Sequence, residues 1–305
     1  MPPSERPGVA PALALMLNAF VWGVSWWPFR ELQSLGLHPL WATALIYAVS
    51  LALLLAVRPQ AWRGLAREPM LWVLLAAAGF TNVGFNWGVT VGDVVRVVLL
   101  FYLMPAWTVI LAWIMLGERP TRWSLVRLVI AMAGVVIVLK TPETPWPVPQ
   151  SLPDWLAIAG GFSFALTNIV LRRLRHVEAP ARIFSMFAGG ALLAGASALV
   201  GMGAGVVPAL PAPQLAWTAV GLALSLGFLA SNVALQYGAA RLDAHASALI
   251  MLSEIVFASV SSVALGAAVL TWRIAVGGAL ILFAAVWSAW DGRTIGDPSA
   301  RGDAP

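Results

Sequence analysis

The chain has 305 residues, of which 60% are hydrophobic and only 10% are charged, and its formal net charge is +5 at pH 7. A soluble domain carries about 25% charged residues, so this composition excludes an ordinary water-soluble fold and predicts an all-α integral membrane protein. The sequence contains no cysteine, which excludes a disulfide framework, a thiol nucleophile and thiolate metal sites.

Apolar stretches fill the chain from residue 10 to residue 290, and each is long enough to cross a hydrocarbon core as a helix of roughly 20 residues. Proline stands at or just before six of them, where the first helical turn has no hydrogen bond to lose. We therefore expect ten transmembrane helices. They cover residues 10–28, 38–57, 70–90, 94–116, 122–139, 154–171, 181–203, 214–236, 244–266 and 270–290.

The basic residues are distributed unequally between the two sides of the predicted helices. If the N-terminus is inside, 14 of the 18 Lys and Arg residues fall on the inner side and 4 on the outer side. Because basic residues collect in cytoplasmic loops, we expect both tails, residues 1–9 and 291–305, to be cytoplasmic. The four outer residues are Arg30, Arg96, Lys140 and Arg273.

Several residues of the first half recur in the second half at a nearly constant distance. At a shift of 150, Asn82, Asn86, Gly88 and Asp93 correspond to Asn232, Gln236, Gly238 and Asp243. Trp123 recurs as Trp272 at a shift of 149, and Ser25 and Arg30 recur as Thr167 and Arg172 at a shift of 142. Residues 10–139 and 154–290 are therefore predicted to be two five-helix repeats. Because five is odd, the second copy lies upside down, an arrangement typical of transporters that bind substrate between the repeats.

Residues 103–120, Leu-Met-Pro-Ala-Trp-Thr-Val-Ile-Leu-Ala-Trp-Ile-Met-Leu-Gly-Glu-Arg-Pro, resemble a pattern of the drug/metabolite transporter superfamily, EamA type. The pattern has a proline in the fourth helix, an apolar run and Gly-Glu before the fifth helix. The resemblance extends over residues 13–290, and Gly134 matches a glycine usual in the following helix. In the second copy, Glu254 and Ala267 stand where Pro and Glu are common. Residues 101–105, Phe-Tyr-Leu-Met-Pro, also resemble the aromatic amino-acid exporter branch.

The resemblance implies ten helices in inverted repeats and a secondary carrier or facilitator that exports small metabolites or amino acids across the inner membrane of a bacterial cell. It implies a small-molecule substrate and the lipid bilayer as partners, and no cofactor. The sequence has no Gly-rich phosphate loop followed by Lys-Ser/Thr, so ATP is not the energy source within this chain. The basic run at residues 172–176 is short and adjoins a membrane end, which argues against nucleic acid.

Amide side chains form two pairs on repeat-related helices. Asn82 and Asn86 lie four residues apart and share one helix face, and Asn232 and Gln236 do the same. An amide in hydrocarbon needs a partner, so both faces are expected to point away from lipid. Two interpretations stay open: the amides line a central cavity and bind substrate, or they form hydrogen bonds between helices.

An aromatic stripe runs along the first predicted span, where Asn18, Trp22 and Trp26 follow a spacing of four. Aromatic rings with an amide suit an amphipathic organic solute, so these three residues are candidates for substrate binding. The alternative is a belt of tryptophans at the membrane interface. Trp27, nearer the outer end, is assigned to that belt, whereas Trp22 and Asn18 lie deeper.

The fourth predicted span contributes two further candidates, Tyr102 and Pro105. Pro105 has no N–H and leaves the carbonyl around Phe101 unpaired. This gives either a hinge or substrate contact, or a kink that neighbouring helices satisfy. At the outer end of the same span, Asp93 and Arg96 lie three residues apart and are predicted to pair with each other.

Glu254 falls near the centre of the ninth predicted span. A charged side chain at the bilayer centre costs roughly 2.5–3.5 kcal/mol on insertion scales. Protonation of Glu254 could couple transport to protons, or its carboxylate could pair with a substrate ammonium. The alternative is a permanently protonated acid bonded to Ser253 or to another helix. Because intramembrane acids are usually functional, Glu254 is the proton-coupling candidate.

A membrane-embedded enzyme is the alternative class of function. The sequence has no His-Glu-x-x-His motif, no Gly-x-Ser-x-Gly elbow and no acids or histidines at metal-binding spacing within a span. We therefore expect neither an enzyme nor a metal site. A carrier of lipid-linked sugars, with a lateral opening to lipid, is the second alternative.

Overall fold

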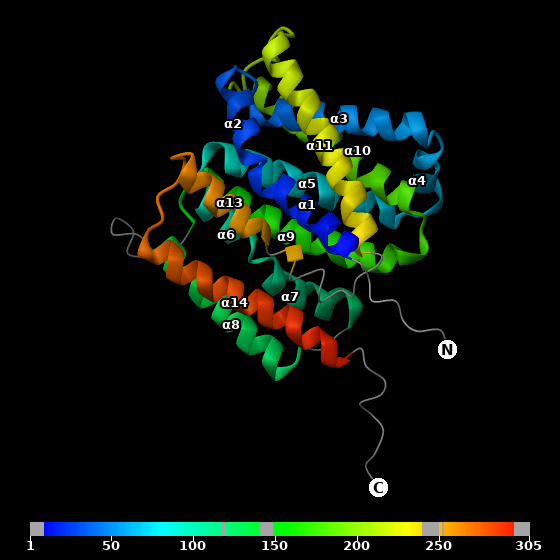
Figure 1. Cartoon of the computed structure of the whole chain (residues 1–305). Coiled ribbons are helices and arrows are strands. Elements are labelled where there is room, and N and C mark those ends of the chain that lie inside the picture. Colours follow the sequence, from blue (N-terminus) through cyan, green and yellow to red (C-terminus); the bar gives the residue numbers. More distant parts are fainter. Residues whose placement is uncertain (1–8, 118–119, 141–148, 240–249, 252, 296–305) are drawn as a thin grey trace.

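The computed structural model describes residues 9–117, 120–140, 149–239, 250–251 and 253–295 (Figure 1). Within these residues the chain forms helices and connecting turns, and no strand occurs. The α-helices in chain order are α1 (Val9–Val24), α2 (Trp26–Ser34), α3 (Pro39–Val57), α4 (Gly64–Arg67), α5 (Met70–Val91), α6 (Val94–Phe101), α7 (Met104–Leu116), α8 (Arg122–Leu139), α9 (Leu152–Arg173), α10 (Ala179–Gly203), α11 (Leu215–Ala239), α13 (Ser253–Ala264) and α14 (Trp272–Ile295). Short 3-10 turns, η1 (Ala61–Arg63) and η2 (Leu174–His176), precede α4 and follow α9.

Seven helical segments of the described chain are long and apolar enough to cross a membrane. They are Val9–Ser34, Pro39–Val57, Met70–Val91, Val94–Leu116, Leu152–His176, Ala179–Gly203 and Leu215–Leu235. Shorter apolar helices, Leu125–Ile137, Ser253–Ala264 and Trp272–Ala284, lie where the fifth, ninth and tenth spans are predicted. The predicted all-helical, multi-pass membrane protein is thus confirmed, whereas the count of ten crossings stays a prediction.

Proline and a capping side chain begin several helices at the predicted borders. Pro39, Pro153 and Pro180 lie in the first turns of α3, α9 and α10. At the start of α9 the side chain of Ser151 also accepts a hydrogen bond from the Asp154 N–H. Proline fits this position because the first-turn N–H groups have no partner within the helix.

Two of the long segments are interrupted, each close to a proline. The first breaks at Ser25, whose hydroxyl donates to the Trp22 carbonyl at 2.8 Å, and Pro28 follows in the first turn of α2. The fourth breaks at residues 102–103, and Pro105 lies in the first turn of α7. Because proline has no N–H for the preceding turn, neither helix continues through it unbroken.

The contacts between helices are the same in kind when the two predicted repeats are interchanged. The helix α5 packs on α9 and α10, just as α11 packs on α1 and α3. The broken pair α6 and α7 packs on α9, as α13 packs on α1. The pairs α8 with α14, α3 with α10 and α6 with α13 complete the set. We count α1 with α2, and α6 with α7, as one span each. If every span is then replaced by its equivalent in the other predicted repeat, each of these contacts becomes another member of the set or maps onto itself.

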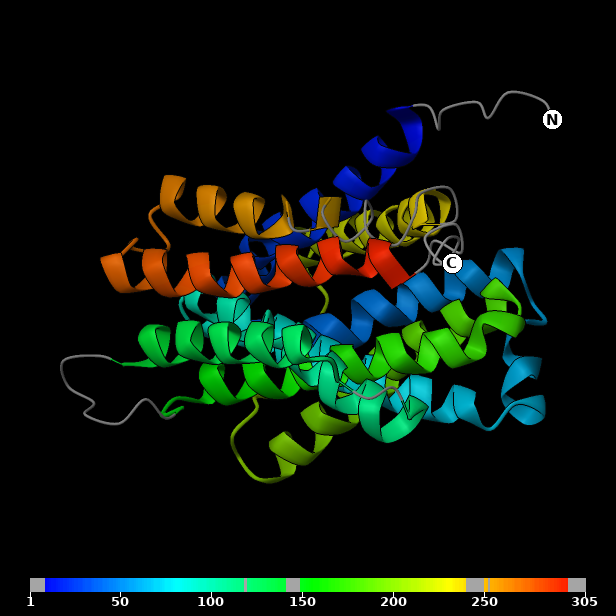
Figure 2. The ribbon, with the colours of Figure 1, turned by 90° about the horizontal axis from the view of Figure 1, so that it is seen from below.

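The pairs lie at distinct places in the molecule. In Figure 1, α8 and α14 run together along one edge, and α3 and α10 lie toward the opposite edge. Figure 2 shows that most of the helix axes run in a broadly common direction. Four hydrogen bonds within the described residues join helix ends that are predicted on the same side of the membrane: Trp41 with Pro208 and Arg273 with Lys140 on the outer side, and His176 with Glu68 and Arg173 with Met115 on the inner side.

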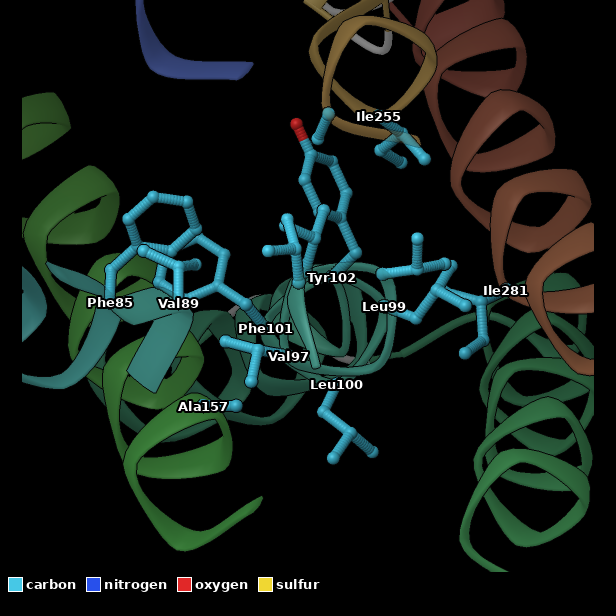
Figure 3. Close-up of a cluster of buried hydrophobic side chains, with 14 of the residues drawn as sticks. Phe85, Val89, Val97, Leu99, Leu100, Phe101, Tyr102, Ala157, Ile255 and Ile281 are labelled. Atoms are coloured by element: carbon cyan, nitrogen blue, oxygen red, sulfur yellow. The ribbon is translucent and has the colours of Figure 1, made fainter. Parts of the chain in front are cut away.

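The short helix α6 lies at the centre of the packed helices. Its side chains reach four neighbouring helices (Figure 3): Phe85 and Val89 of α5, Ala157 of α9, Ile255 of α13 and Ile281 of α14 all lie around it. Every residue of α6 except Arg96 is buried. By contrast, large apolar side chains such as Leu222, Leu226 and Val233 of α11 are exposed at the surface, as expected of a face toward lipid.

Candidate functional site

A buried hydrogen bond joins α6 to α13 at the centre of the molecule. Tyr102, which follows the last residue of α6, donates its hydroxyl to Glu254 Oε2 at 3.1 Å. The same hydroxyl lies 3.5 Å from the Met251 carbonyl oxygen. Tyr102 is 3% exposed and Glu254 is 9% exposed. In Figure 3 the Tyr102 ring points from α6 toward the helix that carries Ile255.

The partner of Glu254 therefore comes from another helix. Ser253, the neighbouring alternative, donates its hydroxyl to the Ile250 carbonyl at 2.6 Å. Within the described part of the chain, Glu254 forms no ion pair with a basic side chain. Among the described residues the site thus combines a carboxyl group and a phenol, which can hold a proton or accept a cationic group.

Glycines bring backbone carbonyls against the helices that flank this bond. A Cβ atom added at Gly23 of α1 would lie 2.7 Å from the Glu254 carbonyl oxygen, so α1 and α13 are in backbone contact. Gly161 of α9 lies equally tightly against the Phe101 carbonyl oxygen. This is the carbonyl to which Pro105 has no N–H to donate. In this structure α9 covers that carbonyl, but a glycine Cα supplies no N–H or O–H donor, so both interpretations of the kink stay open.

The aromatic stripe of α1 and α2 faces the protein interior. Asn18 donates from Nδ2 to Ser231 on α11, at 2.6 Å to the hydroxyl and 3.0 Å to the carbonyl oxygen. Trp26 donates from Nε1 to the Ser261 hydroxyl of α13 at 2.9 Å. Trp27, which the sequence assigns to the interfacial belt, is 57% exposed. The stripe therefore connects α1 and α2 to α11 and α13.

Trp22 is the member of the stripe with aromatic neighbours. Its ring centroid lies 4.7 Å from that of Phe228 on α11 and 5.9 Å from that of Phe85 on α5. The Phe228 ring also lies 5.8 Å from the Tyr47 ring of α3. Phe85, Phe228 and Tyr47 are buried and Trp22 is partly buried, so this cluster of rings joins helices of both predicted repeats in the interior.

The amides of α5 point into the protein and contact α3. Asn82 accepts a hydrogen bond from the Tyr47 hydroxyl at 2.6 Å, and Asn86 donates from Nδ2 to the Thr43 hydroxyl at 3.2 Å. The Asn86 Oδ1 atom is buried and has no hydrogen-bond partner. In this conformation the two amides form hydrogen bonds between α3 and α5, and the Asn86 Oδ1 atom is an acceptor without a donor.

The remaining candidates are described less completely. Asn232 of α11 is partly buried and has an interacting partner. The side chains of Pro105 and Gln236 lie outside the described residues, so their predicted contacts are untested.

At the N-terminal end of α6, charged residues form contacts that sequence reasoning missed. Asp93 caps the helix by accepting from the backbone N–H of Arg96 at 2.8 Å. The guanidinium of Arg96 binds the carboxylate of Asp154 on α9, at 2.7 Å and 3.0 Å. Arg30 donates to the Gly92 carbonyl and lies over the Trp26 ring. No local pattern signals the partner of Arg96, since Asp154 is 58 positions away.

Comparison with known proteins adds a family and a fold. Residues 10–140 match the model of the EamA-like transporter family. None of the curated proteins matches the chain. A solved structure described only as the crystal structure of a protein is similar, with 18% sequence identity and a TM-score of 0.58 over 94% of this chain and 99% of that one. At this identity the likeness shows the fold alone.

Proposed function

Because residues 10–140 match the model of the EamA-like transporter family, we propose that this chain is a secondary carrier that exports a small organic solute by alternating access. The solute is an amino acid or a related amphipathic compound. The carrier lies in the inner membrane of a bacterial cell, with both termini in the cytoplasm. Ten helices form two inverted repeats, residues 10–139 and 154–290, and the solute passes between them.

The helix contacts, which are the same in kind when the two predicted repeats are interchanged, support the inverted repeats. A two-fold axis between repeats brings corresponding residues together wherever they lie near that axis. At a shift of 149, Tyr102 corresponds to Met251, and the Tyr102 hydroxyl lies 3.5 Å from the Met251 carbonyl. The hydrogen bonds between helix ends predicted on the same side support the alternating direction of the helices.

The observation that carries the proposal is the buried bond between Tyr102 and Glu254. It joins one helix from each repeat, at a point where lipid and packed side chains exclude water. A protonated carboxyl accepts the Tyr102 hydrogen bond less strongly than a carboxylate. A proton or a solute ammonium on Glu254 therefore changes the contact between α6 and α13. That change is the differential interaction that alternating access requires.

The aromatic neighbours of Trp22 support the choice of an amphipathic solute. Trp22, Phe85 and Phe228 meet from α1, α5 and α11, and Asn18 lies one turn before Trp22 on the same face. Separation of α1 from α11 frees both the rings and the Asn18 amide from their present partners. In such a state the stripe can bind an apolar body and fix a polar group.

The proposal is tested by a metabolite screen followed by reconstitution. The protein is overproduced, and compounds that accumulate in the medium are compared with those from cells that carry an empty vector. Candidates are then measured with purified protein in vesicles. We expect saturable transport of an amino acid or related amphipathic solute. Vesicles that contain folded protein but transport none of the accumulated compounds contradict the proposal.

A further inference from the structure

An ion pair joins the ends of α6 and α9 that lie toward the predicted outer face. Arg96 Nε lies 2.7 Å from Asp154 Oδ1, and Arg96 Nη2 lies 3.0 Å from Asp154 Oδ2. Two parallel bonds of this kind are the strongest arrangement of a guanidinium and a carboxylate. The Asp154 side chain is 3% exposed and that of Arg96 is 22% exposed, so salt screens the pair only weakly.

Both residues are held by the ends of their helices. Asp93 caps α6 through the Arg96 N–H, and Ser151 caps α9 through the Asp154 N–H. The Gln150 N–H donates to Asp154 Oδ2 at 3.3 Å. Asp154 also lies in the first turn of α9, where the helix dipole favours a negative charge. The pair therefore fixes the position of one helix end relative to the other.

The corresponding positions of the other repeat do not provide this ion pair. At shifts of 150 and 149, Arg96 corresponds to Ala246 and His245, which lie outside the described residues, and at a shift of 142, Asp154 corresponds to Ala12, which has no carboxylate. Other charges at these helix ends recur in both copies, since Arg30 corresponds to Arg172 and Asp93 to Asp243. Inverted repeats place corresponding positions at opposite membrane faces. The sequence therefore provides this ion pair at one face only.

We propose that Arg96 and Asp154 form a one-sided latch that closes the outer end of the solute path and makes the inward-facing state the resting state. This inference rests on the inverted-repeat carrier proposed above. The α6–α9 contact flanks one end of the path, and at a shift of 149 to 150 the counterpart of α6 is residues 243–251, most of which lie outside the described residues. A bond that forms in only one of two states shifts the equilibrium toward that state by its own free energy. An exporter at rest then faces the cytoplasm, where its solute is.

The absence of native cysteine makes the latch measurable by single-cysteine labelling. Ala157, one turn beyond Asp154 on α9, is fully buried and lies beside Val97 of α6 in Figure 3. Ala157→Cys therefore reports whether the contact between α6 and α9 is open to solvent. Ala198→Cys is the matched control, because Ala198 is equally buried but lies on α10, away from α6. Each is labelled in intact cells with a membrane-impermeant maleimide.

We expect Asp154→Asn and Arg96→Gln each to raise the labelling rate at Ala157→Cys by about tenfold, while the rate at Ala198→Cys stays unchanged. Arg96→Lys, which keeps the charge but loses the two parallel bonds, gives an intermediate rate and serves where the other variants fold poorly. An unchanged rate at Ala157→Cys, an equal rise at Ala198→Cys, or label that enters only from the cytoplasmic face overturns the latch.

The labelling needs no solute, so the two proposals fail separately. A shifted labelling rate in a protein that transports nothing contradicts the carrier and leaves the ion pair as a conformational lock. Saturable transport with an unchanged labelling rate contradicts the latch alone.

Discussion

The contacts α6–α9 and α1–α13 each join the fourth span of one predicted repeat to the first span of the other, although at a shift of 149 α13 corresponds to α7, and they agree in backbone packing but differ in polar chemistry. In each, a glycine lies against a carbonyl oxygen of the partner: Gly161 against Phe101, and Gly23 against Glu254. The difference lies in the polar groups, since an ion pair joins α6 to α9, whereas the acid that α13 carries next to α1, Glu254, bonds to Tyr102 at the end of α6.

This difference separates what the fold needs from what the function adds. Close approach of helices in lipid depends on small residues, because the tails of the lipid are as apolar as the side chains. That requirement is met in both copies. Intramembrane charges cost free energy and are kept only where they act. The ion pair and Glu254 each occur in one copy, so we propose that they give the two halves different tasks.

The largest effect is expected from removal of the acid. Glu254→Gln keeps the size of the side chain but cannot bind or release a proton, so proton-driven transport in reconstituted vesicles should be abolished. Tyr102→Phe, which removes only the hydrogen bond, should reduce transport and preserve its dependence on the proton gradient. Uptake by the Glu254→Gln protein that equals wild type at every pH would remove Glu254 from the mechanism.

Substitution of the two glycines tests whether both contacts need backbone packing. Gly161→Ala and Gly23→Ala each place a Cβ against a carbonyl oxygen, and each should lower stability in detergent by roughly 1–3 kcal/mol. Gly221→Ala on α11 is the control, since nothing lies within 4 Å of the added Cβ. That variant should be neutral or stabilised by up to about 1 kcal/mol. The comparison fails if only one of the two contacts is sensitive.

The smallest effect concerns the aromatic stripe. Trp22→Ala should weaken solute affinity by roughly tenfold, because the ring contacts Phe85 and Phe228 in the interior. Trp27→Ala should change affinity less than about twofold, since the exposed Trp27 ring faces outward. Thermal stability of both variants is measured in parallel. Equal, small changes in affinity would show that Trp22 does not bind solute and would favour the alternative of an interfacial tryptophan.

Most of the fold could be predicted from the sequence because lipid leaves few alternatives. Each backbone polar group must be satisfied within the segment, so every long apolar run is a helix. Proline at residues 39, 153 and 180 marks helix starts for the same reason. The break at Ser25 was not predicted, although Pro28 follows it, because a proline near the end of a span also suits an unbroken helix.

The candidate site was predictable only in part. Helical spacing correctly placed Asn82 and Asn86 inside. Trp27, assigned to the interfacial belt by its place near the end of the span, is exposed. The partners were not predictable, because they lie on helices that only tertiary packing brings close. Asn82 bonds to Tyr47, and Arg96 binds Asp154, 58 positions away, while Asp93 caps the helix instead.

The central claim, that the two halves lie in opposite directions in the membrane, is tested most directly at two corresponding loops. Gln60, between α3 and α5, and Leu210, between α10 and α11, are 150 positions apart and both exposed. Each is replaced by cysteine in the otherwise cysteine-free chain and exposed to an impermeant maleimide. We predict that Leu210→Cys is labelled in intact cells and Gln60→Cys only after the membrane is permeabilised. Labelling of both from the same side would contradict the inverted repeat.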